Sequence, residues 1–453
     1  MCSALTHRLR SELKFFAQCN MLPNLPLIAI GKTVSKISQT LNRGNGSTWP
    51  GHIALKGNPN FINDILVNSQ TKVIIVAGTN GKTTTSGLIR AGLEKNGKSV
   101  IQNDSGANLL NGVASTIILN ANRNGKLTQD YAIFEVDENA LPQVVQQIKP
   151  SYLVLLNLFR DQLDRYGEIN AIAEKWKGAV LELDDKTKIV LNADDPLIAY
   201  MGMELKHPTL FFGVDNEKTN THDSGAADSV SCPHCGKRLT FEKIVFSHLG
   251  KWKCTACGLI QPKKQISEFP YYPLAGVYNK YNTHAASVVL KDLGINERQI
   301  INAFETFVPA FGRQEKITYE GKNVQLFLSK NPTSFNQSFA TIKNLKASTV
   351  LLILNDRIPD GRDVSWIWDT DLSGLIEFNH IFVAGDRVYD MALRLKYELG
   401  MKHYEKKIIT FENLKEAINQ GINAVQQNET LYILPTYSAM LDARKILTGK
   451  KIL

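Results

Sequence analysis

Apolar residues along this chain follow two patterns, short aliphatic runs typical of buried strands and longer segments with apolar residues at helical spacing. From Thr71 onward the two patterns alternate, which predicts a parallel sheet with helices on both of its faces. In this first part we expect a helix at 168–182, and strands at 72–77, 99–103, 131–137, 151–158, 187–192 and 209–213.

A second set of strands and helices follows. Residues 215–230 are polar and lack periodicity, which indicates a linker into an insertion, and the alternation resumes near Tyr271. Residues 308–312 form a second expected boundary. Beyond it we expect another α/β set, with helices at 386–398 and 412–425 and strands at 323–328, 349–354, 380–384, 407–410 and 431–434.

These patterns divide the chain into three regions. Residues 1–24 read as an extension, and 27–41 as a helix. The expected regions are therefore an N-terminal extension and helix at 1–48, a central α/β domain at 49–310 with an insertion at about 228–265, and a C-terminal α/β domain at 311–453.

The composition is that of a globular chain with a basic surface. Its 453 residues carry a formal net charge of +9. That charge suits a nucleotide, a nucleic acid or an anionic membrane, but an ordinary solvated surface explains it equally well. No apolar run is long enough to span a membrane, and residues 1–20 lack the apolar core of a secretory signal. Cysteine usage favours a reducing, cytoplasmic environment.

The most informative stretch joins the strand expected at 72–77 to a helical pattern. The intervening turn is rich in glycine, and Gly78 and Gly81 let the backbone approach a phosphate closely. Lys82 can reach the outer phosphates, and the Thr83 hydroxyl can hold Mg²⁺. The loop is shorter than the usual phosphate-binding loop, but a strand before it and a helix after it predict a nucleoside triphosphate site.

Polar side chains follow two other expected strands, at the sheet edge where ligands of α/β folds collect. Glu135 is the predicted Mg²⁺ partner of Thr83, because Mg²⁺ takes few protein oxygens and keeps several waters. For Asp137 and Glu138 the pattern favours helix N-capping by one of the two. Residues 192–196 could bind a ribose or a base, although Asp-Asp-Pro also forms an ordinary turn.

Four cysteines form two C-x₂-C pairs, Cys232 with Cys235 and Cys254 with Cys257. Four thiolates at this spacing are typical of tetrahedral Zn²⁺. A zinc ion held by four cysteines has no open position, so we predict a structural role. Basic residues beside the pairs suit nucleic-acid phosphates, but the interpretation as a solvated basic face is favoured.

A dense group of charged and aromatic residues follows the strand expected at 349–354. Between Asp356 and Asp369 lie Asp360, Asp363, two arginines and two tryptophans. This composition fits a functional rim or a partner interface, although turn chemistry with tryptophan packing also explains it.

Together these motifs resemble the Mur ligases, the amide-bond-forming enzymes of peptidoglycan synthesis, and the folylpolyglutamate synthases. The resemblance covers nearly everything from Trp49 onward. The four cysteines and residues 360–367 resemble one branch in particular, the synthase subunits of lipid II isoglutaminyl synthases. The motifs that carry the resemblance are at 78–84, Glu135, 157–167, 192–196, 278–286 and 312–315.

The resemblance implies an α/β fold with a Mur-ligase-like P-loop central domain, an inserted four-cysteine zinc ribbon and a Rossmann-like C-terminal domain. It implies ATP-dependent amidation of the D-glutamate α-carboxyl in the lipid II stem peptide, giving D-isoglutamine. ATP would phosphorylate the carboxylate, and ammonia would displace phosphate from the acyl phosphate. The phosphates of ATP would be held by Gly78, Thr79, Asn80, Gly81, Lys82, Thr83 and Thr84.

The same resemblance assigns roles to single residues. Lys82 and Glu135 would be catalytic, with Mg²⁺ held by Thr83 and Glu135. Adenine would contact Asn282, and the nucleoside would lie near Asn192 and Asp195.

A nitrogen donor is also needed. A glutaminase requires an activated cysteine with a histidine. Here four cysteines are committed to metal, and Cys2 and Cys19 lie in the N-terminal extension, so a separate subunit must release ammonia. The resemblance implies a GatD-like glutaminase partner whose Cys–His triad is completed by Asp363, which would orient the histidine. The substrate lipid II leaves peripheral contact with the cytoplasmic membrane face open.

Other interpretations stay open at this stage. A zinc-ribbon NTPase acting on nucleic acid would need a second acidic motif and an aromatic–basic strip, and neither stands out, so no nucleic-acid partner is expected. A folylpolyglutamate synthase is disfavoured by the cysteines and by residues 360–369. Gln162 departs from the family pattern, because amino-acid-adding Mur ligases usually have histidine there.

Overall fold

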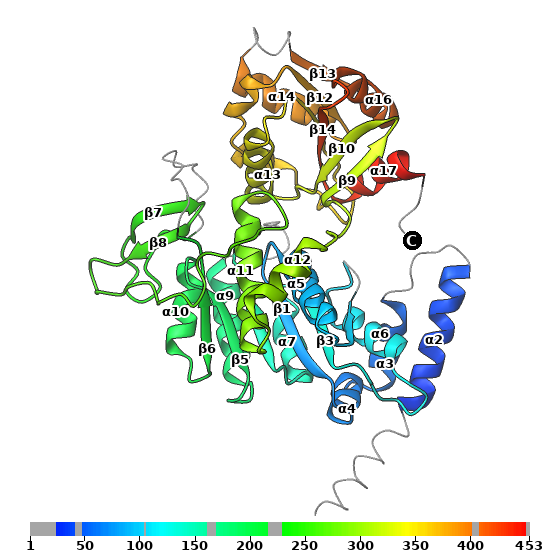
Figure 1. Ribbon diagram of the computed structural model, residues 1–453, viewed down its shortest axis with the longest axis vertical. Helices are drawn as coiled ribbons and strands as arrows, with labels where there is room; N and C mark the ends of the chain where they lie inside the picture. Colours follow the sequence, from blue (N-terminus) through cyan, green and yellow to red (C-terminus); the bar gives the residue numbers. More distant parts are fainter. Residues whose placement is uncertain are drawn as a thin grey trace, which may run out of the picture.

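Two six-stranded sheets organise the protein (Figure 1). The computed structural model describes residues 24–40, 48–103, 106–160, 169–215, 229–400 and 407–449. The strand order is β2-β3-β1-β4-β5-β6 in the first sheet and β13-β12-β11-β14-β10-β9 in the second.

Neighbouring strands of the first sheet all run parallel. The strands are β1 Lys72–Ala77, β2 Val100–Gln102, β3 Tyr131–Val136, β4 Tyr152–Leu155, β5 Lys188–Asn192 and β6 Thr209–Phe212. The helices are α5 Lys82–Lys95, α6 Leu110–Asn120, α7 Leu141–Gln147, α9 Ile169–Leu181, α10 Pro196–Glu204, α11 Val277–Asp292 and α12 Glu297–Glu305. The predicted parallel sheet is confirmed. The fourth strand is shorter than predicted because the residues after Leu155 leave the sheet.

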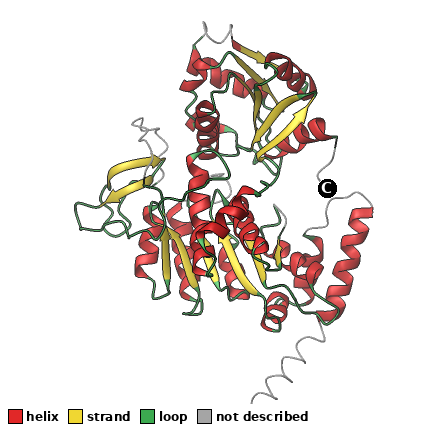
Figure 2. Ribbon diagram, viewed as in Figure 1, coloured by secondary structure: helices red, strands yellow, loops and turns green. Residues whose placement is uncertain are grey.

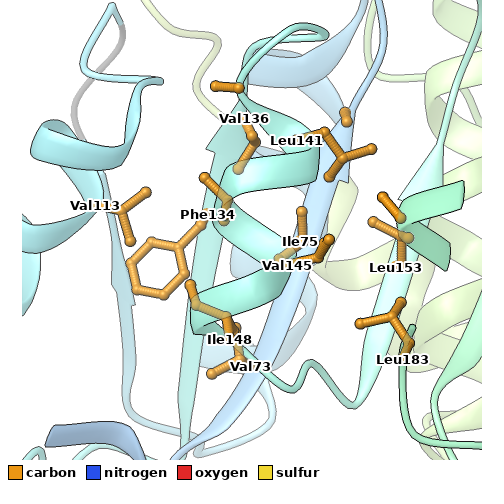
Figure 3. Packing of buried hydrophobic residues seen from close by; sticks show 14 of the residues in the cluster. Val73, Ile75, Val113, Phe134, Val136, Leu141, Val145, Ile148, Leu153 and Leu183 are labelled. Atoms are coloured by element: carbon orange, nitrogen blue, oxygen red, sulfur yellow. The ribbon is translucent and has the colours of Figure 1, made fainter. Parts of the chain in front are cut away.

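Each face of the first sheet packs against its own hydrophobic core. Successive side chains of a strand point to opposite faces, so Ile75 of β1 belongs to one core and Ile74 to the other. Figure 3 shows the first of these cores, in which Phe134 of β3 packs near Val113 and residues of α7 lie over the strands. Burial on both faces explains why these strands read as unbroken aliphatic runs in the sequence.

The second sheet is parallel except for its edge strand β9, which pairs antiparallel with β10. Its strands are β9 Arg313–Tyr319, β10 Lys322–Phe327, β11 Thr349–Ile353, β12 His380–Ala384, β13 Ile408–Thr410 and β14 Thr430–Pro435. Its helices are α13 Pro332–Asn344, α14 Val388–Leu399, α16 Leu414–Ala424, α17 Tyr437–Thr448 and the 3₁₀ helices η1 Ser365–Asp369 and η2 Ser373–Glu377. The hydrophobic pattern did not predict β9 because this half-exposed edge strand is mostly polar.

Within the described residues, three helices precede the first sheet: α2 Asn24–Thr40, α3 Trp49–Gly57 and α4 Phe61–Val67. Helices α3 and α6 pack closely, since the Gly51 N–H donates to Ser115 Oγ at 2.8 Å. A Cβ atom on Gly51 would lie 1.9 Å from the Asn111 carbonyl oxygen. The helix predicted at 27–41 is present, and the predicted extension lies outside the described residues apart from its last residue.

The predicted insertion contains an antiparallel hairpin of β7 Thr240–Phe246 and β8 Leu249–Lys253. It lies beside α10, at the β6 end of the first sheet (Figure 2). Ala199 of α10 packs there with Cys232 and Trp252. Among the described helices, none combines the length and apolarity needed to cross a bilayer.

Candidate nucleotide site and cysteine cluster

A cavity of about 410 Å³ is lined by residues from both sheets and from the inserted hairpin. This volume lies in the usual range for small-molecule sites. From the first sheet come the glycine-rich loop after β1, Glu135 at the end of β3 and Asn157 after β4. From the C-terminal part come Arg313 and Lys330, among others. The cavity therefore combines groups far apart in the sequence.

The loop after β1 has the geometry of a phosphate cradle. Gly78 and Gly81 adopt φ values of 147° and 92°, which side chains rarely tolerate. Asn157 shapes the loop, because its carbonyl oxygen accepts from Thr79 N at 3.0 Å and its side-chain oxygen from Asn80 N at 2.9 Å. Asn80 Nδ2 is buried with no hydrogen-bond partner among the described residues, so a polar acceptor is missing at this place. A bound phosphate would supply it.

Lys82, the first residue of α5, is held at the loop by three oxygens. Its Nζ donates to the carbonyl oxygens of Gly78 and Thr79, and forms an ion pair of 3.1 Å with Glu138. Of the two acids after β3, Asp137 caps the turn that leads into α7, as favoured for one of them, because its Oδ1 accepts from Asn139 N at 3.1 Å and its carbonyl oxygen from Leu141 N at 3.1 Å. Glu138 instead neutralises the lysine of the loop.

Glu135 and Thr83 lie together at the mouth of the loop. Thr83 Oγ1 donates to Glu135 Oε2 at 2.8 Å, and Gln102 Nε2 donates to the other carboxylate oxygen at 3.0 Å. Burial raises the pKa of Glu135, because only 3% of this residue is exposed. A buried carboxylate beside a threonine hydroxyl suits a divalent cation, which would restore the charged form. The two predicted Mg²⁺ ligands therefore fit the ion.

Three further predicted residues are buried. Asn282 of α11 lies behind the loop, where its Oδ1 would be 2.1 Å from a Cβ atom on Gly81. Asn282 also lines the cavity. Asn192 donates to the Leu156 carbonyl oxygen at 3.0 Å, and Asp195 caps α10 by accepting from Leu197 N at 3.1 Å. Neither Asn192 nor Asp195 is among the lining residues, and the nucleotide roles of all three stay predictions.

The four cysteines meet at one point. Their sulfur atoms all lie within 4.8 Å of one another, with Cys232 Sγ 3.7 Å from Cys257 Sγ and Cys235 Sγ 3.5 Å from Cys254 Sγ. A tetrahedron with Zn–S bonds of about 2.3 Å has sulfur–sulfur edges of roughly 3.8 Å. The cluster could therefore hold a metal ion, as predicted, and zinc fits its geometry. The exposed His234 in the first pair contacts the Tyr200 hydroxyl at 3.1 Å.

Comparisons with known proteins identify the family. A family model for the Mur ligase middle domain matches residues 76–290, and one for the MurT ligase C-terminal region matches 328–440. The MurT subunit of the lipid II isoglutaminyl synthase (glutamine-hydrolyzing) of Staphylococcus aureus (strain COL) is 34% identical over 82% of this chain and 86% of that protein. This chain belongs to the MurT family.

Other comparisons agree with the MurT assignment. The MurT subunit of Streptococcus pneumoniae (strain ATCC BAA-255 / R6) is 31% identical over 90% of this chain and 94% of that protein. Among solved structures, MurF from Acinetobacter baumannii has a TM-score of 0.62 at 20% identity, covering 88% of this chain and 80% of its own. A pseudomurein peptide ligase type C from Methanothermus fervidus gives 0.61 at 22% identity, covering 84% and 79%. The predicted Mur-ligase-like fold is confirmed.

In this MurT-family chain the charged segment at 356–369 separates into an internal and an external part. Asp360 is buried and accepts from Ser438 N at 2.7 Å, so it holds the segment to α17. Asp363 is exposed, and its Oδ1 accepts from Ser365 N at 2.8 Å, which lowers the pKa of Asp363. Trp366 packs near Phe335 of α13, with ring centroids 6.3 Å apart. Asp363 thus stands on the surface, outside the cavity lining.

Several residues that line the cavity of this MurT-family chain were not predicted from the sequence. Arg313 and Tyr278 lie in motifs that carried the resemblance, but no role was assigned to them. Burial lowers the pKa of the Arg313 guanidinium, and the charge of Glu135 acts in the opposite direction by attracting this cation. Lys330 follows β10 and carried no recognisable signal. Its neighbour Asn331 caps α13 and reaches Asn80 of the phosphate loop at 3.5 Å.

Proposed function

We propose that this chain is the synthase subunit of a lipid II isoglutaminyl synthase. It would use ATP and Mg²⁺ to convert the D-glutamate α-carboxyl of the lipid II stem peptide into the amide of D-isoglutamine. The observation that carries the proposal is the cavity that joins the phosphate loop, Lys82 and the Thr83–Glu135 pair in a MurT-family chain. The relatives' names supply the substrate class, since both are lipid II isoglutaminyl synthase subunits.

The reaction takes two steps. A carboxylate oxygen of the substrate attacks the γ-phosphorus of ATP, the bond to the bridging oxygen breaks, and ADP leaves. Ammonia then attacks the acyl carbon, a proton is lost, and the C–O bond to phosphate breaks with its electron pair, giving the amide and inorganic phosphate. Bound Mg²⁺ would neutralise charge on the transferring phosphoryl group. Lys82 and Arg313 would stabilise phosphate oxygens from the protein side.

Ammonia would come from a glutaminase partner. The four described cysteines form the metal cluster, and a thiolate committed to metal cannot attack glutamine. Asp363 is exposed and kept ionised by the Ser365 N–H, as a residue that orients a partner's histidine must be. A GatD-like subunit with a Cys–His pair is the partner that this geometry suits.

An apolar surface on α14 and on η1, which begins two residues after Asp363, supports the partner proposal. Tyr389, Leu393 and Tyr397 lie on one face of α14, spaced four residues apart, and are 63%, 48% and 71% exposed. Trp368 of η1 is 50% exposed and contacts Tyr397, with ring centroids 5.7 Å apart. We call these four residues the α14 surface. Clustered exposed aromatic and aliphatic side chains are typical of an interface.

The location and the metal complete the proposal. The protein would work in the cytoplasm, beside the membrane face where its substrate lies, with no nucleic acid bound. The four-cysteine cluster would hold a structural zinc ion. The limits of the predicted domains and the nucleotide contacts of Asn192, Asp195 and Asn282 remain part of the proposal.

The test is phosphate release by the purified chain with ATP, Mg²⁺, ammonium chloride and lipid II, followed by mass spectrometry of the stem peptide. We expect ammonium-dependent phosphate release and a mass loss of about one unit, because OH is replaced by NH₂. Glu135→Ala should abolish both while the variant still binds the glutaminase subunit. Phosphate release that DNA stimulates, with lipid II unchanged, would refute the proposal.

A further inference from the structure

The tip of the inserted hairpin reaches the nucleotide cavity. Strands β7 and β8 are joined by the two residues Ser247 and His248, and Ser247 takes the left-handed conformation with φ of 50°. The residues that flank this turn, Phe246 and Leu249, pair with each other across the hairpin. Both side chains line the cavity. The insertion therefore contributes to the cavity in addition to carrying the cysteine cluster. Ordinary phosphate contacts do not need these apolar side chains.

Phe246 is part of an aromatic group that continues from the phosphate loop. Its ring stacks on Phe159 with centroids 5.8 Å apart and planes at 26°, and it meets Tyr281 edge-on at 5.6 Å. Phe159 N donates to Thr79 Oγ1 at 3.1 Å, which ties the group to the loop. Phe159, Tyr281 and Leu249 all line the cavity. An apolar wall therefore begins where the polar phosphate cradle ends.

The hairpin is fixed to the first sheet by the turn after β5. Gly250 N donates to the Asp194 carbonyl oxygen at 3.2 Å, and Trp252 Nε1 to the Ala193 carbonyl oxygen at 3.0 Å. Asp195 Oδ2 lies 3.4 Å from His248 Nε2 and accepts from Leu158 N at 3.0 Å. Asp195 thus joins the hairpin tip to the chain segment that leads to Phe159. These contacts fix the position of the hairpin tip, and with it Phe246 and Leu249, relative to the first sheet.

We propose that the hairpin tip, through Phe246 and Leu249, forms the wall against which the nucleobase of ATP packs. The inserted ribbon is then a part of the nucleotide site as well as a metal-binding module. The planar face of a base suits an apolar aromatic wall, while the loop holds the phosphates. This inference rests on the proposed use of ATP. It also gives a role to the inward-facing contacts of Ala193, Asp194 and Asp195, which position the hairpin from inside the protein.

The experiment compares two probes that share the phosphate site but differ in the base. Equilibrium binding of Mg·ATP and of Mg·tripolyphosphate is measured by calorimetry on the full-length, metal-loaded chain. Phe246→Ala should weaken ATP binding about tenfold or more and leave tripolyphosphate binding unchanged. Ile244→Ala is the matched control, because it truncates an apolar side chain on the same strand outside the cavity, and it should change neither.

Folding of the variants is checked by metal content and melting temperature. Phe246→Leu keeps an apolar side chain and should lose less ATP affinity than Phe246→Ala, with full metal content. ATP binding by both Phe246 variants at wild-type affinity would overturn the inference, and so would an equal loss of ATP and tripolyphosphate binding. A wild-type chain that binds tripolyphosphate as tightly as ATP would also overturn it. A wild-type chain that binds neither probe would instead refute the proposed function.

Discussion

Lys82 Nζ lies 3.1 Å from Glu138 Oε2, and the two side chains are only 11% and 3% exposed. The lysine expected to bind phosphate thus has an internal counter-ion. A buried ion pair is costly to break from one side, because the remaining charge stays desolvated. Glu138 therefore holds Lys82 in place, and phosphate would become a second anion for the same ammonium group.

Glu138→Gln should destabilise the nucleotide-free protein by about 3 kcal/mol, because it leaves Lys82 buried without a counter-ion. Mg·ATP should then raise the melting temperature more in the variant than in the wild type, because its phosphates replace the lost charge. Thermal unfolding with and without Mg·ATP measures both effects. Glu94→Gln is the control, because it removes an exposed ion pair with Arg90 on α5, the helix that begins at Lys82. It should change neither the stability nor the effect of Mg·ATP on the melting temperature. A variant as stable as the wild type would contradict this role of Glu138.

Glu135 gives a pH dependence of defined sign. Burial raises its pKa above the ordinary value of 4.5, so above pH 4.5 the folded state binds more protons than the unfolded state. The free energy of unfolding contributed by this group therefore falls as pH rises from 4.5 through the folded-state pKa. Glu135→Gln cannot ionise, and it should be more stable than the nucleotide-free wild type at neutral pH, with the difference shrinking toward pH 4.5. Denaturant unfolding across this pH range checks it, and a variant less stable at neutral pH would disprove it.

Substitution of Asp363 should slow glutamine hydrolysis and leave amidation with free ammonium unchanged. In the complex with the glutaminase subunit, Asp363→Asn should slow glutamine hydrolysis by about 10²–10⁴-fold, because the partner's histidine loses its orienting carboxylate. Amidation with free ammonium should be unaffected, since Asp363 lies outside the cavity lining. Asp369→Asn, an exposed acid at the end of the same segment, is the control. An unchanged glutaminase rate in Asp363→Asn would show that the triad is completed elsewhere.

The cysteine cluster predicts a metal-dependent stability. Replacing Cys232 and Cys257 with serine should reduce zinc from about one ion per chain to none and lower the melting temperature, because the turns around the metal lose their common anchor. His234→Ala should keep its zinc, since His234 contacts Tyr200 and is not among the four ligands. Elemental analysis with thermal unfolding tests both variants. Full zinc content in the double variant would rule out this site.

The α14 surface predicts where the partner binds. Leu393→Glu should weaken the affinity for the glutaminase subunit at least about tenfold, because a charge would be buried in an apolar contact. Amidation with free ammonium should persist. Leu181→Glu places the same charge on α9, at a leucine that is 58% exposed, and should leave the affinity unchanged. Size-exclusion chromatography and calorimetry of the pair give the answer, and equal affinities for the two variants would place the interface elsewhere.

The sequence could place Lys82 and Thr83 on one loop because local structure fixes them there, and their roles stay predictions. A buried strand followed by a glycine-rich turn and a helix determines where the loop side chains point. The partner of Lys82 could not be predicted in this way, since Glu138 is 56 positions away and reaches it only in the folded protein. A carboxylate after a strand looks the same in the sequence whether it caps a helix or neutralises a lysine.

The segment at 192–195 shows that polar residues after a strand can also bind other parts of the protein. Its polar residues follow a strand, as ligand-binding residues do, but the structure turns Asn192 and Asp195 inward to protein partners. Asn192 binds the segment after β4, and Asp195 caps α10 and also contacts His248 of the inserted hairpin, a packing contact that has no signature in the sequence. Arg313 and Lys330 could not be assigned to the cavity from the sequence, because they reach it from the C-terminal part of the chain and only in the folded protein.

Helix α13 has a consequence for how the two proposed activities communicate. Its capping residue Asn331 reaches Asn80 of the phosphate loop, and Phe335, one turn further on, packs near Trp366 in the segment that carries Asp363. The first turn of α13 thus lies between the nucleotide loop and the segment that carries Asp363. A partner that binds this segment would therefore lie close to the same helical turn that touches the nucleotide loop. This turn would be the shortest structural connection between ammonia production and carboxylate activation.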